Sequence, residues 1–173
     1  MAQVQKRRRN WGRMVIKVEK HGALWYLFRA PIYFYRCRMG WLFGNRLLLL
    51  THRGRRSGLR RQTVLEVVEY RPEGPEVVVV NGFKDSDWVR NIEATPREEV
   101  TVGAHHFVAS HRFLGEEEAG RVMAGYERRN RFIAPIVRRG LSWLAGWTYH
   151  GSDTERRRLV RQLSLIAFRP VAS

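Results

Sequence analysis

The sequence LLLLTHRGRRSGLRRQTVLE, residues 47–66, contains two predicted strands and the turn that joins them. Its leucine run and Thr51 predict a buried strand, and a second strand rich in valine and leucine is expected over 63–70. The turn, residues 53–61, combines arginines with a serine and two glycines. Glycine permits the positive φ of a tight turn, and the arginine guanidinium offers a fork of donors that matches phosphate or carboxylate oxygens. The turn is therefore interpreted either as an anion-binding loop or as an ordinary basic hairpin turn.

Further strands and helices follow in an order that indicates the fold class. Trp88 and Ile92 are four residues apart and therefore share one face of the first expected helix. No element is assigned to residues 132–149, which a proline and two glycines interrupt, or to the charged stretch 155–161. The expected elements are strands at 47–51, 63–70, 76–81, 100–102, 107–113 and 163–168 and helices at 85–93 and 116–129. This order, with its short connections, predicts a mainly β (α+β) fold, a small closed or split antiparallel barrel with flanking helices.

The chain of 173 residues carries a formal net charge of +16, almost all of the basic residues being arginine. Such a charge implies an anionic partner, which is nucleic acid, an acidic membrane surface, or a ligand with phosphate or carboxylate groups. Because no helix-turn-helix or RNP-like pattern is present, specific nucleic-acid binding is not expected. Cys37 is the only cysteine, which excludes an internal disulfide and indicates a reducing compartment such as the cytoplasm.

The sequence predicts two parts, residues 1–40 and residues 41–173. The first begins with a basic tail and continues as an apolar, aromatic stretch from Trp11 to Tyr35. Charged residues interrupt this stretch, so an amphipathic helix is expected rather than a membrane span. Two interpretations stand side by side: the helix packs on its own domain, or it lies on the anionic inner face of a membrane.

Familiar catalytic motifs are absent from the sequence. It contains no G-x-S-x-G elbow, no Walker loop and no HExxH pattern, and its six histidines have no carboxylate at ligand spacing. A metal site is therefore not expected. If the protein is an enzyme, a bound cofactor is expected to carry the reaction.

Two blocks of the sequence resemble the deazaflavin (F420)-dependent nitroreductase family of F420H2-dependent oxidoreductases. Residues 48–58, LLLTHRGRRSG, followed by Arg61 and Leu65, are similar to the strand–turn–strand signature of that family. The second block runs from Asn81-Gly82 through SDWVRNI at 86–92 to the strand at 100–102, and the family has a similar helix, proline and strand there. The likeness extends from about residue 46 to residue 112.

The resemblance implies a split β-barrel related to FMN-binding barrels, with F420 as a hydride-carrying cofactor. The phosphate of the cofactor would lie against the turn, and its oligoglutamate tail would follow a basic groove. FMN is the alternative cofactor, because it also offers a phosphate, but it lacks the acidic tail. The cofactor-binding residues that the resemblance implies are Arg53, Arg55, Arg56, Ser57, Gly58, Arg61, Thr63, Phe83, Lys84, Asp87 and Trp88.

The implied activity is hydride transfer from reduced deazaflavin to a small electrophilic acceptor, namely a quinone, an enone or a nitro compound. Tyr126 and Glu66 are the candidate catalytic residues, as donors of the accompanying proton. Glu66 stands where some relatives have a tyrosine, and it is also interpreted as an outward-facing strand residue, since Leu65 and Val67 alternate with it. The competing hypothesis is a basic membrane- or nucleic-acid-binding module without catalysis.

Overall fold

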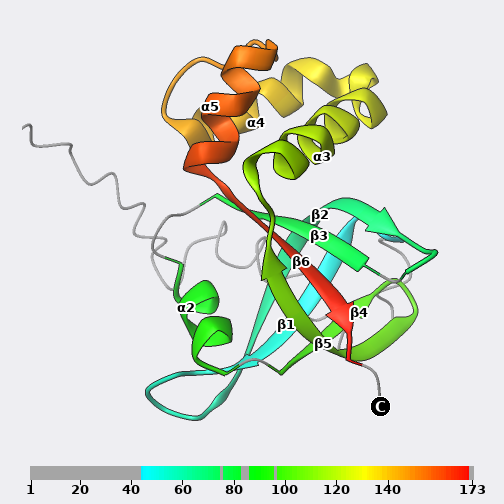
Figure 1. Cartoon of the computed structure of the whole chain (residues 1–173), viewed down its shortest axis with the longest axis vertical. Coiled ribbons are helices and arrows are strands. Elements are labelled where there is room, and N and C mark those ends of the chain that lie inside the picture. Colours follow the sequence, from blue (N-terminus) through cyan, green and yellow to red (C-terminus); the bar gives the residue numbers. More distant parts are fainter. Residues whose placement is uncertain (1–43, 75, 83–85, 96, 172–173) are drawn as a thin grey trace, which may run out of the picture.

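The computed structural model describes residues 44–74, 76–82, 86–95 and 97–171. In this part of the chain, six strands form a closed antiparallel barrel in the order β1-β2-β3-β6-β5-β4 (Figure 1). The mainly β barrel with flanking helices that the sequence predicts is confirmed. The strands are β1 (Leu47–Arg53), β2 (Arg60–Arg71), β3 (Glu76–Asn81), β4 (Glu98–Val102), β5 (His105–Phe113) and β6 (Ser164–Pro170).

Strand pairing shows how the barrel closes. The hairpin of β1 and β2 pairs Leu50 with Thr63 and continues as far as Arg53 and Arg60, beyond the apolar part of either strand. The last strand, β6, pairs with β3 on one side and with β5 on the other. The barrel is therefore closed by a strand that lies far along the chain from both of its neighbours.

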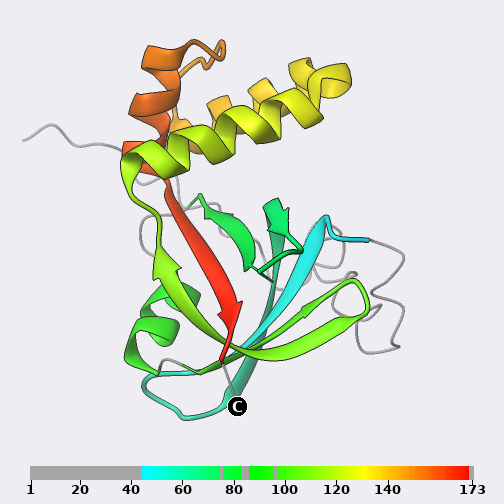
Figure 2. The same cartoon turned by 45° about the vertical axis from the view of Figure 1, so that its right-hand side comes forward.

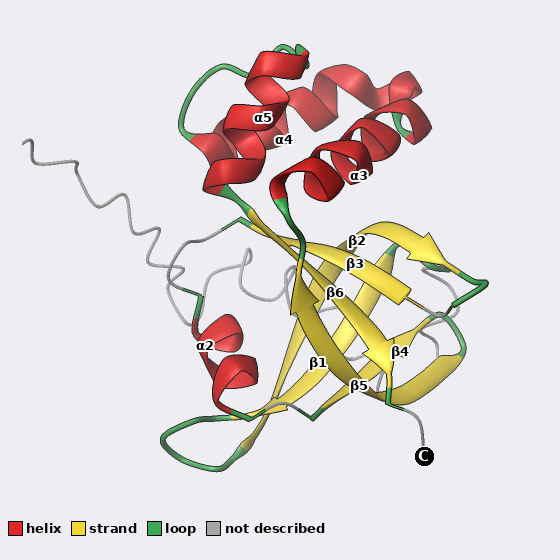
Figure 3. Ribbon diagram, in the orientation of Figure 1, coloured by secondary structure: helices red, strands yellow, loops and turns green. Residues whose placement is uncertain are grey.

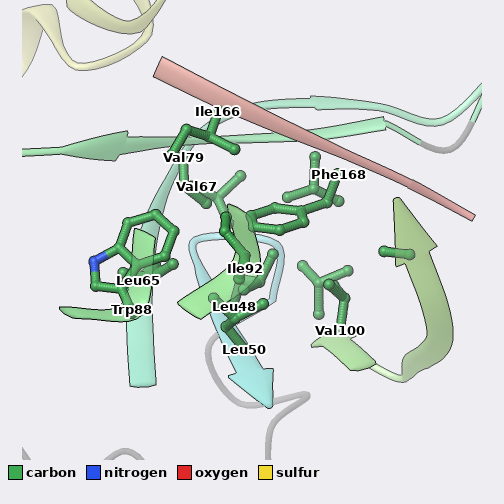
Figure 4. Close-up of a cluster of buried hydrophobic side chains, with 13 residues drawn as sticks. Leu48, Leu50, Leu65, Val67, Val79, Trp88, Ile92, Val100, Ile166 and Phe168 are labelled. Carbon is green, nitrogen blue, oxygen red and sulfur yellow. The ribbon is translucent and has the colours of Figure 1, made fainter. Parts of the chain in front are cut away.

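The barrel interior is filled by every second side chain of the strands, as the alternation of a β-strand requires. Helix α2 (Asp87–Ala94) adds Trp88 and Ile92 to this core, which confirms that the two residues share one buried face. Burying a side chain of this size stabilises the fold by about 1.5–3 kcal/mol. Figure 4 shows part of the core, which consists of Leu48, Leu50, Leu65, Val67, Val77, Val79, Trp88, Ile92, Val100, Val102, Ala109, Ile166 and Phe168.

A layer of helices covers one end of the barrel, as Figures 2 and 3 show. It contains α3 (Glu116–Arg129), the 3-10 turn η2 (Arg131–Ile133), α4 (Ala134–Ala145) and α5 (Asp153–Gln162). A second apolar cluster joins this layer to the outer faces of β2, β3 and β6, with Met123, Leu141 and Leu159 among its members. The layer fixes the position of α3 over β2.

The helix α3 has the predicted bounds, whereas α4 and α5 were not predicted. Pro135 stands in the first turn of α4, where a helix tolerates proline, and Gly146, at φ +73°, ends that helix. Helix α5 begins with a capping box in which the Ser152 hydroxyl accepts from the Glu155 backbone and the Glu155 carboxylate accepts from the Ser152 backbone.

Some predicted features lie outside the described residues. They are the N-terminal helix expected at 11–35 with the division near residue 40, Cys37, Phe83 and Lys84. None of the helices that the structure describes is long and apolar enough to cross a membrane. Within the described ranges, no three histidine, cysteine, aspartate or glutamate side chains are grouped so that they could hold a metal ion.

A buried carboxyl group lies in the barrel wall at the start of β4, one residue before Glu99, which pairs with Thr51 of β1. Glu98 is fully buried on β4, and its Oε1 atom is 3.1 Å from Nδ1 of His111 on β5. Its Oε2 atom has no hydrogen-bond partner among the described residues. Burial raises the pKa of Glu98 to about 7 and lowers the pKa of His111. Both side chains are therefore biased toward their neutral forms.

Candidate cofactor site

The turn between β1 and β2 is shaped by its two glycines. Gly58 has φ +64°, a conformation that side chains disfavour, and its N–H donates to the Gly54 carbonyl at 2.7 Å. The Gly54 N–H in turn donates to the Leu59 carbonyl at 2.9 Å. A Cβ atom on Gly54 would lie 2.7 Å from the Ser57 hydroxyl oxygen, closer than such atoms approach. The Ser57 hydroxyl is the end of an exposed side chain and can turn away, so the loop conformation depends on glycine at position 58, where φ is positive.

The loop is attached to helix α2 through Arg55. The Arg55 backbone N–H and its Nη1 atom both donate to Oδ1 of Asn91, at 3.0 and 3.1 Å, and Nη1 also pairs with Asp87 at 2.9 Å. The Arg55 guanidinium lowers the pKa of Asp87. The structure thus brings the predicted residues Arg55 and Asp87 together, but as partners of each other.

Asn91 was not predicted as a site residue, although its side chain accepts the two Arg55 hydrogen bonds that attach the loop to α2. It is buried, and its Nδ2 atom lies 3.3 Å from Nδ1 of His52 on β1. Burial lowers the pKa of His52, and the charge of Arg61 acts in the same direction, so the imidazole is neutral at pH 7 and Nδ1 accepts from the Asn91 amide. Two sequence signals were available for Asn91: its place in the SDWVRNI block and its spacing of four residues from Asp87 on one helix face.

The remaining arginines of the loop face solvent. Arg53, Arg56 and Arg61 are exposed, and within the described ranges none of the three has a carboxylate within 4 Å. Among the described residues, the Arg53 guanidinium donates only to the Gly58 carbonyl, at 3.4 Å. The exposed Ser57 hydroxyl lies between them in the sequence, and Thr63 is half-buried on β2.

Several arginines outside the loop are paired with carboxylates. Arg112 donates to Glu118 at 2.7 Å and to the buried Glu76 at 3.0 Å, and Arg71 pairs with Glu76 at 2.5 Å. In the loop, Arg55 pairs with Asp87 and Arg60 pairs with Glu99 at 2.5 Å. The guanidinium donors of Arg53, Arg56 and Arg61 are left available. Three such donors, a hydroxyl and a glycine turn fit the chemistry of a phosphate group.

Trp88 is placed differently from the other residues of its predicted group. Its side chain is 9% exposed and packs among Leu65 and Ile92 in the barrel core (Figure 4). Little of its surface is therefore left for a ligand, and its observed contacts hold α2 on the barrel. Asp87, one residue earlier, faces the loop instead.

The two candidate catalytic residues, sixty positions apart in the sequence, are in contact. The Tyr126 hydroxyl on α3 donates to Oε1 of Glu66 on β2 at 2.6 Å. Glu66 is exposed on the outer face of the strand, while Leu65 and Val67 point into the core, so its outward orientation is confirmed. Burial, with a contribution from Glu66, raises the pKa of Tyr126, which keeps its phenol protonated.

A pocket of about 320 Å³ opens beside this pair, between β2 and α3. Its volume is at the lower end of the range typical of small-molecule sites. Glu66 and Arg61 are five residues apart on β2, about 17 Å along the strand, so the loop and the pocket are separate places on one element. The pocket is lined by Asn45, Arg46, Glu66, Val67, Glu69, Tyr70, Tyr126, Arg129 and Asn130.

Comparisons with known proteins give one family match. The model of the family described as "F420H(2)-dependent quinone reductase" matches residues 29–130, more than half of the chain. No curated protein matches the sequence.

Solved structures match this chain at low sequence identity. An F420-H2 dependent reductase (FDR-A) is 18% identical, with 72% of this chain and 95% of that chain covered and a TM-score of 0.46. A pyridoxamine 5'-phosphate oxidase-related, FMN binding protein from Nostoc punctiforme is 12% identical over 87% and 81%, with a TM-score of 0.42. HutZ from Vibrio cholerae, described as a heme storage protein, is 12% identical over 80% and 90%, with a TM-score of 0.43.

Proposed function

Since the chain belongs to the F420H(2)-dependent quinone reductase family, we propose that it reduces a quinone with a hydride from reduced deazaflavin. The chain is a deazaflavin-dependent oxidoreductase, and F420 is its cofactor. When bound, this cofactor supplies two-electron hydride chemistry. Enones and nitro compounds are the other electrophilic acceptors that this chemistry suits. The protein itself contributes binding, orientation and proton supply.

The observation that carries the proposal is the loop with available donors. Arg56, Arg61 and the Ser57 hydroxyl would hold the linker phosphate of the cofactor, with the turn at Gly58 allowing its close approach. Arg55 would position the loop rather than bind the phosphate, because Asp87 and Asn91 already engage its guanidinium. FMN would place a phosphate on the same donors, but it has no acidic tail to complement a net charge of +16.

The pocket beside Tyr126 is the proposed site of the acceptor. Reduction of a quinone by hydride leaves negative charge on an oxygen, which Arg46 and Arg129 in the pocket lining would stabilise. The Tyr126 phenol is neutral and can supply a proton after its hydroxyl turns away from Glu66. Leaving that hydrogen bond to a carboxylate costs about 1.5–3 kcal/mol, which is small beside a chemical barrier.

A binding titration tests the assignment of the loop. Purified protein is titrated with F420 and separately with FMN, and absorbance and fluorescence are followed. We expect tight binding of F420 only, and we expect Arg56→Ala and Arg61→Ala each to weaken it about 10- to 100-fold, since a hydrogen bond to a charged group is lost.

The exposed Arg157 on α5 provides the control, because Arg157→Ala removes the same charge far from the loop. It is expected to change F420 affinity less than about twofold. Equal affinity of the wild type and both loop variants, or preferential binding of FMN, would show that the assignment is wrong. Turnover of a soluble quinone, an enone and a nitroaromatic compound then identifies the acceptor class.

A further inference from the structure

Bulky apolar side chains are exposed on η2 and α4. Phe132 is 85% exposed, Ile136 is 70% exposed, and Ile133 and Trp143 are also exposed. Ile136 and Trp143 are seven residues apart, about two helical turns, so they lie on the same face of α4. Leu141 on the other face packs in the helical cluster. The helix therefore has one apolar face against the protein and a second apolar face toward solvent.

The same segment carries positive charge without acidic residues. Residues 128–152 contain five arginines, at 128, 129, 131, 138 and 139, and neither aspartate nor glutamate. Across the described ranges, none of the five is within 4 Å of a carboxylate oxygen. The Arg131 guanidinium lies over the Phe132 ring, 4.9 Å from its centroid. Charge and apolar surface are thus combined on one short helical segment.

We propose that η2 and the outward face of α4 form a docking surface for an anionic lipid bilayer. Phe132, Ile133 and Ile136 would enter the interface between headgroups and acyl chains, and Arg131 and Arg139 would bind the anionic headgroups. An amphipathic helix lying in the plane of a membrane has this combination of residues. The proposed docking of this surface on a bilayer does not depend on which cofactor and substrate the protein uses.

Charge complementarity favours a lipid surface over other partners. A second copy docked through the same face would bring the arginines of the two copies together, because a twofold interface uses one patch twice. The phosphates of a nucleic acid would neutralise the arginine side chains, but they would leave the isoleucines and Phe132 without an apolar environment. An anionic bilayer satisfies both kinds of side chain.

The docking surface begins, in the sequence, at the residue directly after the pocket lining. Arg129 and Asn130 line the pocket beside Tyr126, and η2 begins at the next residue. The family match ends at residue 130, so the docking surface lies outside the region that defines the family.

Vesicle flotation of the full chain tests the proposal. The probes are vesicles of phosphatidylcholine alone and vesicles containing one quarter phosphatidylglycerol. We expect the protein to float with the anionic vesicles and to stay at the bottom with the neutral ones. The double variant Phe132→Ser/Ile136→Ser is expected to bind anionic vesicles at least about tenfold more weakly, and so is Arg131→Glu/Arg139→Glu at low salt.

Each double variant has a matched control. Val108→Ser/Val171→Ser replaces two exposed apolar residues near the other end of the molecule, and Arg97→Glu/Arg157→Glu changes the charge equally. Both controls are expected to bind within about twofold of the wild type. All variants are expected to keep the wild-type melting temperature, since the replaced side chains are exposed.

Three outcomes would overturn the proposal. The first is a wild-type protein that does not bind anionic vesicles. The second is a loss of vesicle binding in the control variants while the variants of the docking surface still bind. The third is a Phe132→Ser/Ile136→Ser variant with a clearly lowered melting temperature or, in size-exclusion chromatography, a smaller oligomer than the wild type. That result would show that the surface is covered by the chain itself or by a second copy.

Discussion

Replacing Glu98 with glutamine should make the protein more stable at alkaline pH. Glu98 is fully buried, and its pKa in the folded protein is raised to about 7 from 4.5. At about 1.4 kcal/mol per pKa unit, this rise corresponds to about 3 kcal/mol of folding free energy. Because the folded pKa lies above the unfolded one, this stability is fully present below pH 4.5 and is lost as the pH rises through 7.

His111 acts in the opposite direction. Its pKa is lowered in the folded protein, so its contribution is present above its usual pKa of 6.5 and is lost as the pH falls through the folded value. Glutamine at position 98 keeps the size of the side chain and a hydrogen bond to His111 while removing the ionisable group. Only the alkaline loss should therefore disappear in Glu98→Gln.

Urea denaturation at pH 4.5 and pH 8.5 measures the effect. We expect the free energy of unfolding of Glu98→Gln to equal that of the wild type at pH 4.5 and to exceed it by about 3 kcal/mol at pH 8.5. Glu73 lies exposed in the turn after β2, so Glu73→Gln is the control and should change stability by less than about 0.5 kcal/mol at either pH. A Glu98→Gln variant no more stable than the wild type at pH 8.5 would refute the reasoning.

Three other substitutions probe the site and the loop. Tyr126→Phe should lower quinone turnover about 100-fold while F420 affinity is unchanged, and steady-state kinetics with unaltered kcat would exclude a role as proton donor. Asn91→Ala removes the oxygen shared by two Arg55 donors and should cost about 1–3 kcal/mol in urea denaturation; a loss below about 0.5 kcal/mol would contradict the anchoring role. Gly58→Ala should destabilise by about 1–2 kcal/mol because of its positive φ, whereas Gly140→Ala inside α4 should stabilise by up to about 1 kcal/mol; effects of equal sign in calorimetry would contradict this.

The strands could be predicted because their apolar patterns end at strong turn signals. The strand at Glu76–Asn81 and the helix at Glu116–Arg129 have the predicted bounds. Strand β2 is longer than predicted, since Arg60, Arg61 and Gln62 continue the ladder with β1 although none of them is apolar. Backbone pairing extends an element beyond the residues that a hydrophobic pattern can identify.

The two missing helices have separate physical reasons. In α4, a proline and a glycine suggested interruptions, yet Pro135 stands in the first turn, where its missing N–H has no intrahelical partner. In α5, the buried residues are only Leu159 and Val160, so the apolar stripe is too narrow to recognise. The capping residues Ser152 and Glu155 were the available signal.

The loop of the candidate site could be predicted from the sequence, but the contacts of its side chains with distant residues could not. Glycines and arginines at short spacing identify the turn because its conformation is local. The attachment of Arg55 to Asn91 and the contact of Tyr126 with Glu66 join residues 36 and 60 positions apart, and only the closed barrel brings them together. The assignment of each guanidinium to a structural or a binding role depends on those distant partners.

The placement of β6 between β3 and β5 has a consequence for the nascent chain. During translation, the valine-rich strand β3 emerges from the ribosome long before Ser164–Pro170, with which it pairs. Until then its edge is an open template for hydrogen bonding to other polypeptides. Premature termination ahead of β6 should therefore yield aggregating fragments, and a chaperone that shields β3 should raise the yield of full-length protein.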